Sequence, residues 1–135
     1  MTTVGVFAAI FDDQRRILCV KRDYGPRNWT VPGGGIEPGA SPIQALEREV
    51  REETGFGVRV ARLIGLYSAP FKDDLVLFFE AEIVGREVWQ PGPEIAEIGF
   101  FAEDELPEPM GPRARARIDD AFAGRTGVIR VFDED

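Results

Sequence analysis

The chain has 135 residues, a formal net charge of −8, one cysteine and no histidine. This length suits one domain, residues 1–135, with a core that needs no disulfide. The acidic balance argues against a protein that binds nucleic-acid polymers by neutralising their phosphates. Without histidine, the commonest general base and the commonest zinc ligand are missing. Catalysis would then depend on carboxylates, lysine, arginine, tyrosine or a metal ion, and Mg²⁺ or Mn²⁺ would fit better than zinc.

The sequence shows no apolar stretch long enough to cross a bilayer. Its first residues, MTTVGVFAAIF, lack the basic region and the cleavage site of a signal peptide. Cys19 lies in an apolar run, where we expect a small buried core residue, and a single cysteine fits the reducing cytoplasm. We therefore expect a cytoplasmic protein with no membrane partner.

Apolar runs separated by turn residues predict strands in the first part of the chain. The runs at 3–11 and 16–21 flank the polar residues 12–15, a spacing that predicts a β-hairpin. A short strand is expected at 29–31. Pro32 and the three glycines that follow it are expected to interrupt regular structure.

A complete set of helix signals follows the glycines. Ser41 is a suitable N-cap, Pro42 suits the first helical position, and Gln44 completes a capping box. The helix should run to about Thr54 and end at Gly55. At the helical repeat, four residues form the expected buried stripe: Ile43, Leu46, Val50 and Thr54.

The rest of the chain mixes strand and helix patterns. Strands are predicted at 58–68, 75–84, 98–101 and 128–132, a short helix from Glu103, and a longer helix at 113–123. Strands and helices do not alternate strictly. The expected fold class is therefore α+β, with a mixed sheet and helices packed on its faces, and not a doubly wound parallel sheet.

Three carboxylates dominate the predicted helix. At about 100° per residue, Glu49, Glu52 and Glu53 lie together on one side. Like charges this close repel one another, and a bound cation would remove the repulsion. The glycines at 33–35 offer backbone that can approach a phosphate, so the pair of features predicts metal-assisted phosphate chemistry. A solvated acidic face balanced by neighbouring arginines is the alternative.

Together these residues resemble the Nudix box. The pattern is Gly, five residues, Glu, seven residues, Arg-Glu, an aliphatic residue, any residue, Glu-Glu, any residue, Gly and an apolar residue. The matching positions are Gly34, Arg48, Glu49, Val50, Glu52, Glu53, Gly55 and Phe56. Trp29, the pair Pro32-Gly33 and the stretch 101–107 are also similar to typical Nudix sequence.

Ala40 departs from the pattern, which has Glu at this position. The resemblance assigns that Glu to holding the box arginine and the geometry between loop and helix. We expect Arg48 to keep acidic partners in Glu52, one helical turn on, and in Glu37 of the neighbouring loop. We therefore expect the contacts that hold Arg48 to be weaker and the site to remain active.

The resemblance implies a Nudix-like α/β/α sandwich with a mixed central sheet. It implies hydrolysis of the pyrophosphate bond in a nucleoside diphosphate linked to another group, with Mg²⁺ or Mn²⁺ as cofactor. Glu49, Glu52 and Glu53 would be the metal ligands, together with the Gly33 carbonyl. Arg48 would support these acids, and one of them would also position or deprotonate the attacking water.

Several further residues are candidates for this site. Glu94 or Glu97 could supply an additional acid, and Glu97 is preferred because it directly precedes an apolar run; a rim charge is the alternative. Candidate phosphate contacts are Lys21, Arg22, Arg27 and the backbone of Gly34 and Gly35, with solvated surface charges as the alternative. Trp29 could stack on a base, although a core position is expected.

The sequence leaves the substrate open. Pro70 lies about where ADP-ribose-cleaving relatives carry a proline, but loops attract proline anyway. A nucleoside triphosphate or another nucleotide-linked diphosphate fits equally well, whereas an RNA end would call for a more basic surface. A non-catalytic nucleotide sensor, supported only by Ala40, is the alternative to an enzyme. The expected assembly is a monomer or a homodimer.

Overall fold

The computed structural model describes residues 1–90 and 92–134. In chain order the elements are β1 (Thr3–Ile10), β2 (Ile17–Arg22), β3 (Trp29–Thr30), β4 (Gly33–Gly35), α1 (Pro42–Thr54), β5 (Phe56–Ala69), η1 (Pro70–Lys72), β6 (Asp74–Arg86), β7 (Ile95–Phe101), η2 (Glu103–Glu105), α2 (Pro112–Phe122) and β8 (Val128–Val131). The strands form a five-stranded sheet in the order β4-β1-β6-β5-β8 and a three-stranded sheet in the order β3-β2-β7.

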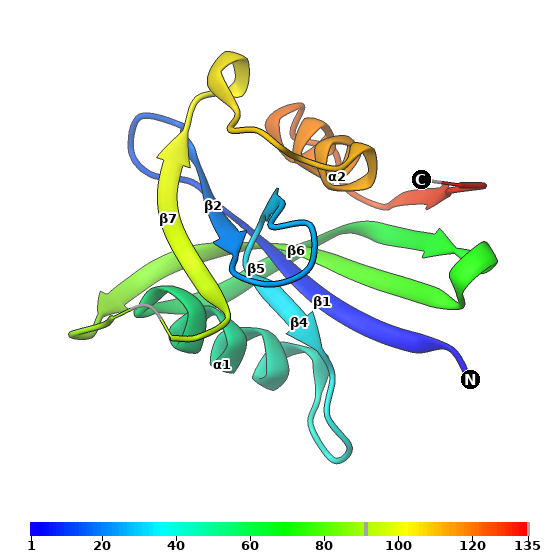
Figure 1. Cartoon of the computed structure of the whole chain (residues 1–135), viewed down its shortest axis with the longest axis horizontal. Coiled ribbons are helices and arrows are strands. Elements are labelled where there is room, and N and C mark those ends of the chain that lie inside the picture. Colours follow the sequence, from blue (N-terminus) through cyan, green and yellow to red (C-terminus); the bar gives the residue numbers. More distant parts are fainter. Residues whose placement is uncertain (91, 135) are drawn as a thin grey trace.

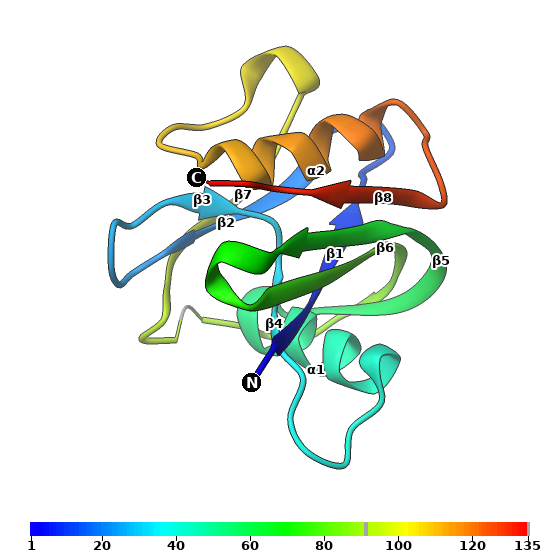
Figure 2. The ribbon, with the colours of Figure 1, turned by 90° about the vertical axis from the view of Figure 1, so that its right-hand side faces the viewer.

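The larger sheet is mixed, as predicted. Its β1–β6 and β5–β8 pairs are parallel, and its other pairs are antiparallel. Helices α1 and α2 lie on opposite faces of this sheet (Figures 1 and 2). The expected α/β/α sandwich is therefore confirmed, and the three-stranded sheet is added beside it.

Strand β1 passes through the centre of the molecule and is covered on both faces. Val6, Ala8 and Ile10 pack in the apolar cluster that includes Leu46 and Val50 of α1. Ala9 packs in the cluster on the other face, with residues of α2. A strand buried on both faces reads as an unbroken apolar run, which explains the composition of its sequence.

The predicted hairpin between 3–11 and 16–21 is wrong. The turn forms, since the Asp12 amide donates to the Arg16 carbonyl at 3.0 Å and Phe11 bridges Ile17. Beyond it the strands separate into different sheets. β1 pairs with β6 along one edge and with β4 at Gly5–Phe7 of the other, whereas β2 pairs with β3 and β7.

The glycine segment also differs from its prediction as a break in regular structure. Gly33, Gly34 and Gly35 form β4, which pairs antiparallel with β1. A Cβ atom on Gly33 would lie 2.2 Å from the Val6 carbonyl oxygen, so only glycine allows this approach. The pairing holds the glycine backbone against the central sheet, directly before α1.

Helix α1 forms where its capping residues predict it. The Ser41 hydroxyl accepts from the Gln44 amide at 3.1 Å, the Gln44 side chain accepts from the Ser41 amide at 3.2 Å, and Gly55 ends the helix with φ 78°. Leu46, Val50 and Thr54 are buried as expected. Ile43 is 47 % exposed, contrary to its prediction. Periodicity gives the direction of a side chain, and it does not show whether another element lies opposite.

The later elements follow their predictions, except that β5, β6 and β7 are longer than predicted and β8 is one residue shorter. The expected helix from Glu103 is the short turn η2, and the helix expected at 113–123 is α2. Cys19 is fully buried in the core, as predicted, and burial raises the pKa of its thiol to about 12. In residues 1–90 and 92–134, neither helix has the length and apolarity that a membrane span requires.

Candidate active site

Helix α1 and the start of β7 enclose a small pocket that contains the three glutamates of the predicted site. This pocket, hereafter the acid pocket, has a volume of about 260 Å³ and is lined by Glu49, Glu52, Glu53, Gly92, Pro93, Glu94 and Ile95. The structure thus brings together carboxylates that the sequence placed on one side of the helix, and it adds a fourth from another segment.

That fourth carboxylate belongs to Glu94. Strand β7 begins at Ile95, three residues earlier than predicted, so Glu94 lies just before the strand. Glu97 lies within β7, exposed and opposite Lys21 in the register of the sheet. Of the two acids considered from the sequence, Glu94 lines the acid pocket and Glu97 does not.

Glu53 connects the helix to the glycine segment. It is only 6 % exposed, and its Oε1 accepts from the Gly33 amide at 3.1 Å. Burial raises the pKa of Glu53 to about 8, although the Gly33 hydrogen bond and the charge of Arg22 act in the opposite direction. Burial and the charge of Glu52 also raise the pKa of Glu49. A cation in this pocket would favour the ionised forms of both acids.

Gly34 leaves space for the carboxylate of Glu49. A Cβ atom at Gly34 would lie 2.9 Å from the carboxyl carbon of Glu49, closer than a side chain can approach. The glycine segment and the acidic helix, separate features of the sequence, are therefore in direct contact in the fold. Gly34 is half-buried and Gly35 is exposed, and a role for either in binding phosphate stays a prediction.

Arg48 links the acidic helix to the loop before it. Its Nη1 donates to Glu37 Oε2 at 2.9 Å and its Nη2 to Glu49 Oε1 at 3.3 Å. Its Nε lies 3.7 Å from Glu52 Oε1, which is an ion-pair distance. The predicted partners Glu37 and Glu52 are thus confirmed. The buried Nε of Arg48 nevertheless has no hydrogen-bond acceptor among the described residues.

This unsatisfied Nε makes Ala40→Glu an informative substitution. We expect the added carboxylate to accept from Arg48 and to raise kcat/KM roughly two- to tenfold, the value of about one hydrogen bond. Steady-state kinetics of the wild type and the variant measure this, and Ala40→Gln controls for side-chain size. A wild type without activity beside an active Ala40→Glu variant would show that the natural site is incomplete.

Arg22 is the basic candidate whose charge acts on one of the acids. It lies at the end of β2, and its charge lowers the pKa of Glu53. Arg27 forms an exposed ion pair with Asp23 at 3.1 Å. Lys21 pairs with Trp29 and Glu97 in the three-stranded sheet. In the part of the chain that the structure describes, neither Lys21 nor Arg27 lines the acid pocket.

Trp29 takes the core position expected for it. It is 6 % exposed and packs edge-on against Phe101, with ring centroids 5.2 Å apart. Sequence reasoning missed two arginines of α2, Arg113 and Arg117, which line a second cleft next to Arg22. A signal was available, because Arg117 adjoins Ile118 and lies one helical turn before Ala121, on the apolar side of the predicted helix.

The donor chemistry of the acid pocket fits a hard divalent cation. Carboxylate oxygens are the ligands that Mg²⁺ and Mn²⁺ prefer. Among residues 1–90 and 92–134, no three acidic or cysteine side chains already converge as a metal site. Arg48 holds Glu52 and Glu49, and the Gly33 amide holds Glu53. Arg48 contacts Glu49 and Glu52 through Oε1 of each, so a cation would compete with Arg48 for these carboxylates.

Comparison with known proteins shows which family the chain belongs to. The NUDIX domain family model matches residues 1–122. A Bacillus subtilis (strain 168) protein, provisionally named an 8-oxo-dGTP diphosphatase, is 36 % identical over 129 residues, covering 95 % of this chain and 85 % of that protein. A Methanocaldococcus jannaschii protein named ADP-ribose pyrophosphatase is 32 % identical over 105 residues, covering 73 % and 62 %.

The fold has close counterparts among solved structures. The crystal structure of a NUDIX hydrolase from Nitrosomonas europaea superposes with a TM-score of 0.85 at 22 % sequence identity, covering 98 % of this chain and 80 % of that one. The family match, the relatives and the contact between glycine segment and acidic helix lead to one assignment. The chain belongs to the NUDIX domain family and is a Nudix-type pyrophosphohydrolase.

Proposed function

We propose that this protein hydrolyses the pyrophosphate bond of a small nucleotide-linked diphosphate in a reaction that depends on Mg²⁺ or Mn²⁺. The observation that carries the proposal is the acid pocket, where Glu49, Glu52 and Glu53 meet the glycine backbone of β4. The names of the two relatives, which refer to 8-oxo-dGTP and to ADP-ribose, support a substrate of this class.

Glu49, Glu52 and Glu53 would hold the cation, with the Gly33 carbonyl as a further oxygen ligand. The cation, when bound, neutralises charge on the phosphate oxygens and makes a nearby water more acidic. Arg48 keeps the acids in place through its contacts with Glu37 and Glu49.

Glu94 would take up the water proton; this assignment is supported by its position in the lining of the acid pocket, just before β7. We therefore propose Glu94, in place of Glu97, as the additional acid. As a carboxylate, Glu94 would receive the proton of the attacking water while the new phosphorus–oxygen bond forms and the bond to the bridging oxygen breaks, and the second phosphate group would leave with that oxygen. Arg22 would contact the phosphates, since its charge already acts on Glu53.

Pro70 has a structural explanation that needs no particular substrate. It occupies the first turn of η1, a place that suits proline, and η1 brings Lys72 to the cleft beside Arg22. A preference for ADP-ribose therefore does not follow from this residue, and a nucleoside triphosphate is an equal candidate.

A substrate panel tests the proposed function. Nucleoside triphosphates, ADP-ribose, sugar nucleotides and dinucleoside polyphosphates are incubated with Mg²⁺ or Mn²⁺, and phosphate is measured after coupled pyrophosphatase or phosphatase treatment. We expect turnover of at least one class, and its loss on chelation of the metal. No turnover of any class, or turnover unaffected by the chelator, contradicts the proposal.

A further inference from the structure

The glycine segment beside the acid pocket has no side chains with which to hold its own position. Strand β4 consists of Gly33, Gly34 and Gly35, and in the described part of the chain β1 is the only strand that pairs with it. Glycine weakens a strand, because its backbone is flexible and it packs no side chain against its neighbours. The Gly33 amide nevertheless donates to Glu53, and the Gly33 carbonyl is the proposed oxygen ligand of the cation. Other residues must therefore hold β4 in place.

Phe7 supplies packing that β4 lacks. It lies on β1 directly opposite Gly33 in the register of the antiparallel pair. A Cβ atom on Gly33 would lie 2.6 Å from Cδ1 of the Phe7 ring, so the ring occupies the space that a side chain at Gly33 would need. The same ring lies against Gly5, where an added Cβ atom would be 3.1 Å from Cε2 of Phe7. An aromatic ring that covers a glycine on the neighbouring strand stabilises the pair.

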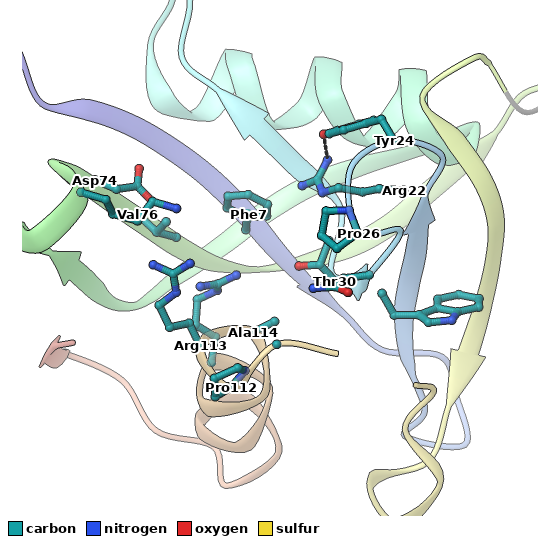
Figure 3. Close-up of a pocket in the computed structure, with 15 residues that line it drawn as sticks. Phe7, Arg22, Tyr24, Pro26, Thr30, Asp74, Val76, Pro112, Arg113 and Ala114 are labelled. Atoms are coloured by element: carbon teal, nitrogen blue, oxygen red, sulfur yellow. Dashed lines mark hydrogen bonds between the residues drawn. The ribbon is translucent and has the colours of Figure 1, made fainter. Parts of the chain in front are cut away.

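Arg117 of α2 contacts this ring as well. Its guanidinium lies over the Phe7 ring, 5.2 Å from the centroid, which is within the range of a cation–π interaction. In Figure 3 the Phe7 ring projects from β1 toward the cleft beside the start of α2, and Arg117 also lines this cleft. Arg117 is only 8 % exposed. A cation–π interaction is stronger where water is excluded, so the burial of Arg117 favours this contact.

Arg117 keeps its charge in this buried position. Burial lowers the pKa of Arg117 to about 10, although the charge of Asp74 acts in the opposite direction, so the guanidinium is a cation at pH 7. Burying a cation is less favourable than burying an apolar side chain of similar size. The attraction to Asp74 and the contact with the Phe7 ring both offset this cost. An apolar residue at this position would fill the space but would leave the ring without its cation.

We propose that Phe7 and Arg117 are positioning residues of the active site, which hold Gly33 from the side of α2. The guanidinium orients the ring, and the ring keeps Gly33 in contact with Glu53 and in place for the metal ion; we call these contacts the Phe7 stack. Arg117 belongs to α2 and Glu53 to α1, which lie on opposite faces of the sheet (Figures 1 and 2). A change on α2 should therefore reach the site on α1. The part that concerns the metal ion rests on the proposed function.

Hydrogen exchange of the Gly33 amide tests the Phe7 stack without any metal. The metal-free wild type is compared with Phe7→Leu, which removes the ring, and with Arg117→Met, which removes the cation. We expect the Gly33 amide to exchange roughly 3- to 30-fold faster in each variant, the value of a buried cation–π contact, because its hydrogen bond to Glu53 opens more often. An unchanged exchange rate in Phe7→Leu, or in Arg117→Met if the first variant does not fold, overturns the proposal even when the enzyme is active.

A second pair of an aromatic ring and an arginine in the same chain provides the matched control. Arg15 lies over the ring of Phe11, 4.6 Å from the centroid, and this ring packs edge-on against Phe122 of α2. Phe11→Leu and Arg15→Met therefore remove a similar contact just beyond the end of β1. They should lower Tm but change the exchange rate of the Gly33 amide by less than about twofold, since distant sites act independently. Equal acceleration in the control variants would assign the effect to overall destabilisation and overturn the proposal.

The affinity for Mn²⁺ connects the Phe7 stack to the proposed function. Mn²⁺ is titrated into the protein without substrate, and the free ion is measured by electron paramagnetic resonance. We expect Kd to rise roughly 3- to 30-fold in Phe7→Leu and in Arg117→Met, and no further in the double variant, because Arg117 acts through the ring. An unchanged Kd in Phe7→Leu, or fully additive losses in the double variant, overturns the proposal. A wild type that binds no Mn²⁺ contradicts the metal-ligand assignment, and the hydrogen-exchange result then still decides whether the stack holds Gly33.

Discussion

Replacing Glu52 by glutamine is expected to lower kcat/KM by roughly 10²- to 10⁴-fold, because it removes a proposed ligand of a cation that stabilises the transition state by several kcal/mol. Glutamine keeps the size of the side chain but removes one negative charge from a pocket that also holds Glu49 and Glu53. With less charge and one ligand fewer, the pocket would hold a divalent cation more weakly. Steady-state kinetics at several Mg²⁺ and Mn²⁺ concentrations measure the effect, and part of the loss should be recovered at high metal concentration.

Glu47→Gln is the matched control for this substitution. Glu47 lies on the same helix, is half-buried, and does not line the acid pocket. Its substitution removes the same charge from α1, so it should change kcat/KM by less than about twofold if long-range electrostatics is screened by solvent. Similar losses in the two variants would mean that the net charge of the helix matters and the position of Glu52 does not.

Asp120→Asn is expected to lower the free energy of unfolding by about 3 kcal/mol at pH 7, at the lower end for breaking a buried charge pair. Asp120 is fully buried and accepts from Tyr67 Oη at 2.8 Å, from Arg125 Nη1 at 2.9 Å and from Arg130 Nε at 2.7 Å. These contacts join α2 to β5 and β8. The two guanidinium groups are half-exposed, which keeps the expected loss at this lower end.

The pH dependence of this loss has a defined sign. Hydrogen bonds from Arg130, and after the opposing effect of burial those from Tyr67 and Arg125, lower the pKa of Asp120 from 3.8 to about 2. Because the folded pKa is below the unfolded one, the stabilisation is complete above the unfolded value and disappears as pH falls through about 2. The difference between wild type and Asp120→Asn should therefore shrink between pH 4 and pH 2.

Thermal and urea unfolding measure this difference, with a fall in Tm of roughly 10 °C expected at pH 7 for a chain of this size. Asp119→Asn is the control, because Asp119 is the exposed neighbour on the same helix. A difference that stays constant from pH 7 to pH 2 would assign the loss to packing and would exclude the charge of Asp120 as its cause.

The features predicted well from the sequence are those with local causes. The capping residues of α1 act within four positions of one another, and the spacing of Glu49, Glu52 and Glu53 follows from the helical repeat alone. For the same reason, the sequence could predict that these three side chains line the same pocket. The positions of the strands could be predicted from apolar runs, because a buried strand is apolar whichever strand it pairs with.

The choice between Glu94 and Glu97 could not be made correctly from the local sequence. The predicted strand started at Ile98 because the apolar run starts there. In the structure, pairing with β2 extends β7 back to Ile95. That extension carries Glu97 into the strand and leaves Glu94 at the acid pocket. Where a strand begins depends on the length of the strand with which it pairs. The sequence of one strand alone does not give the length of its partner.

By itself, the sequence determined the acidic helix, its caps and the family, because each depends on spacing within one short segment. The tertiary structure alone decided that Gly33 and Gly34 touch Glu53 and Glu49, that β1 pairs with β6 instead of β2, and that Arg22 and Arg117 share a cleft. These contacts join residues 15 to about 95 positions apart. They arise only when apolar faces pack together, and such packing is a property of the whole chain.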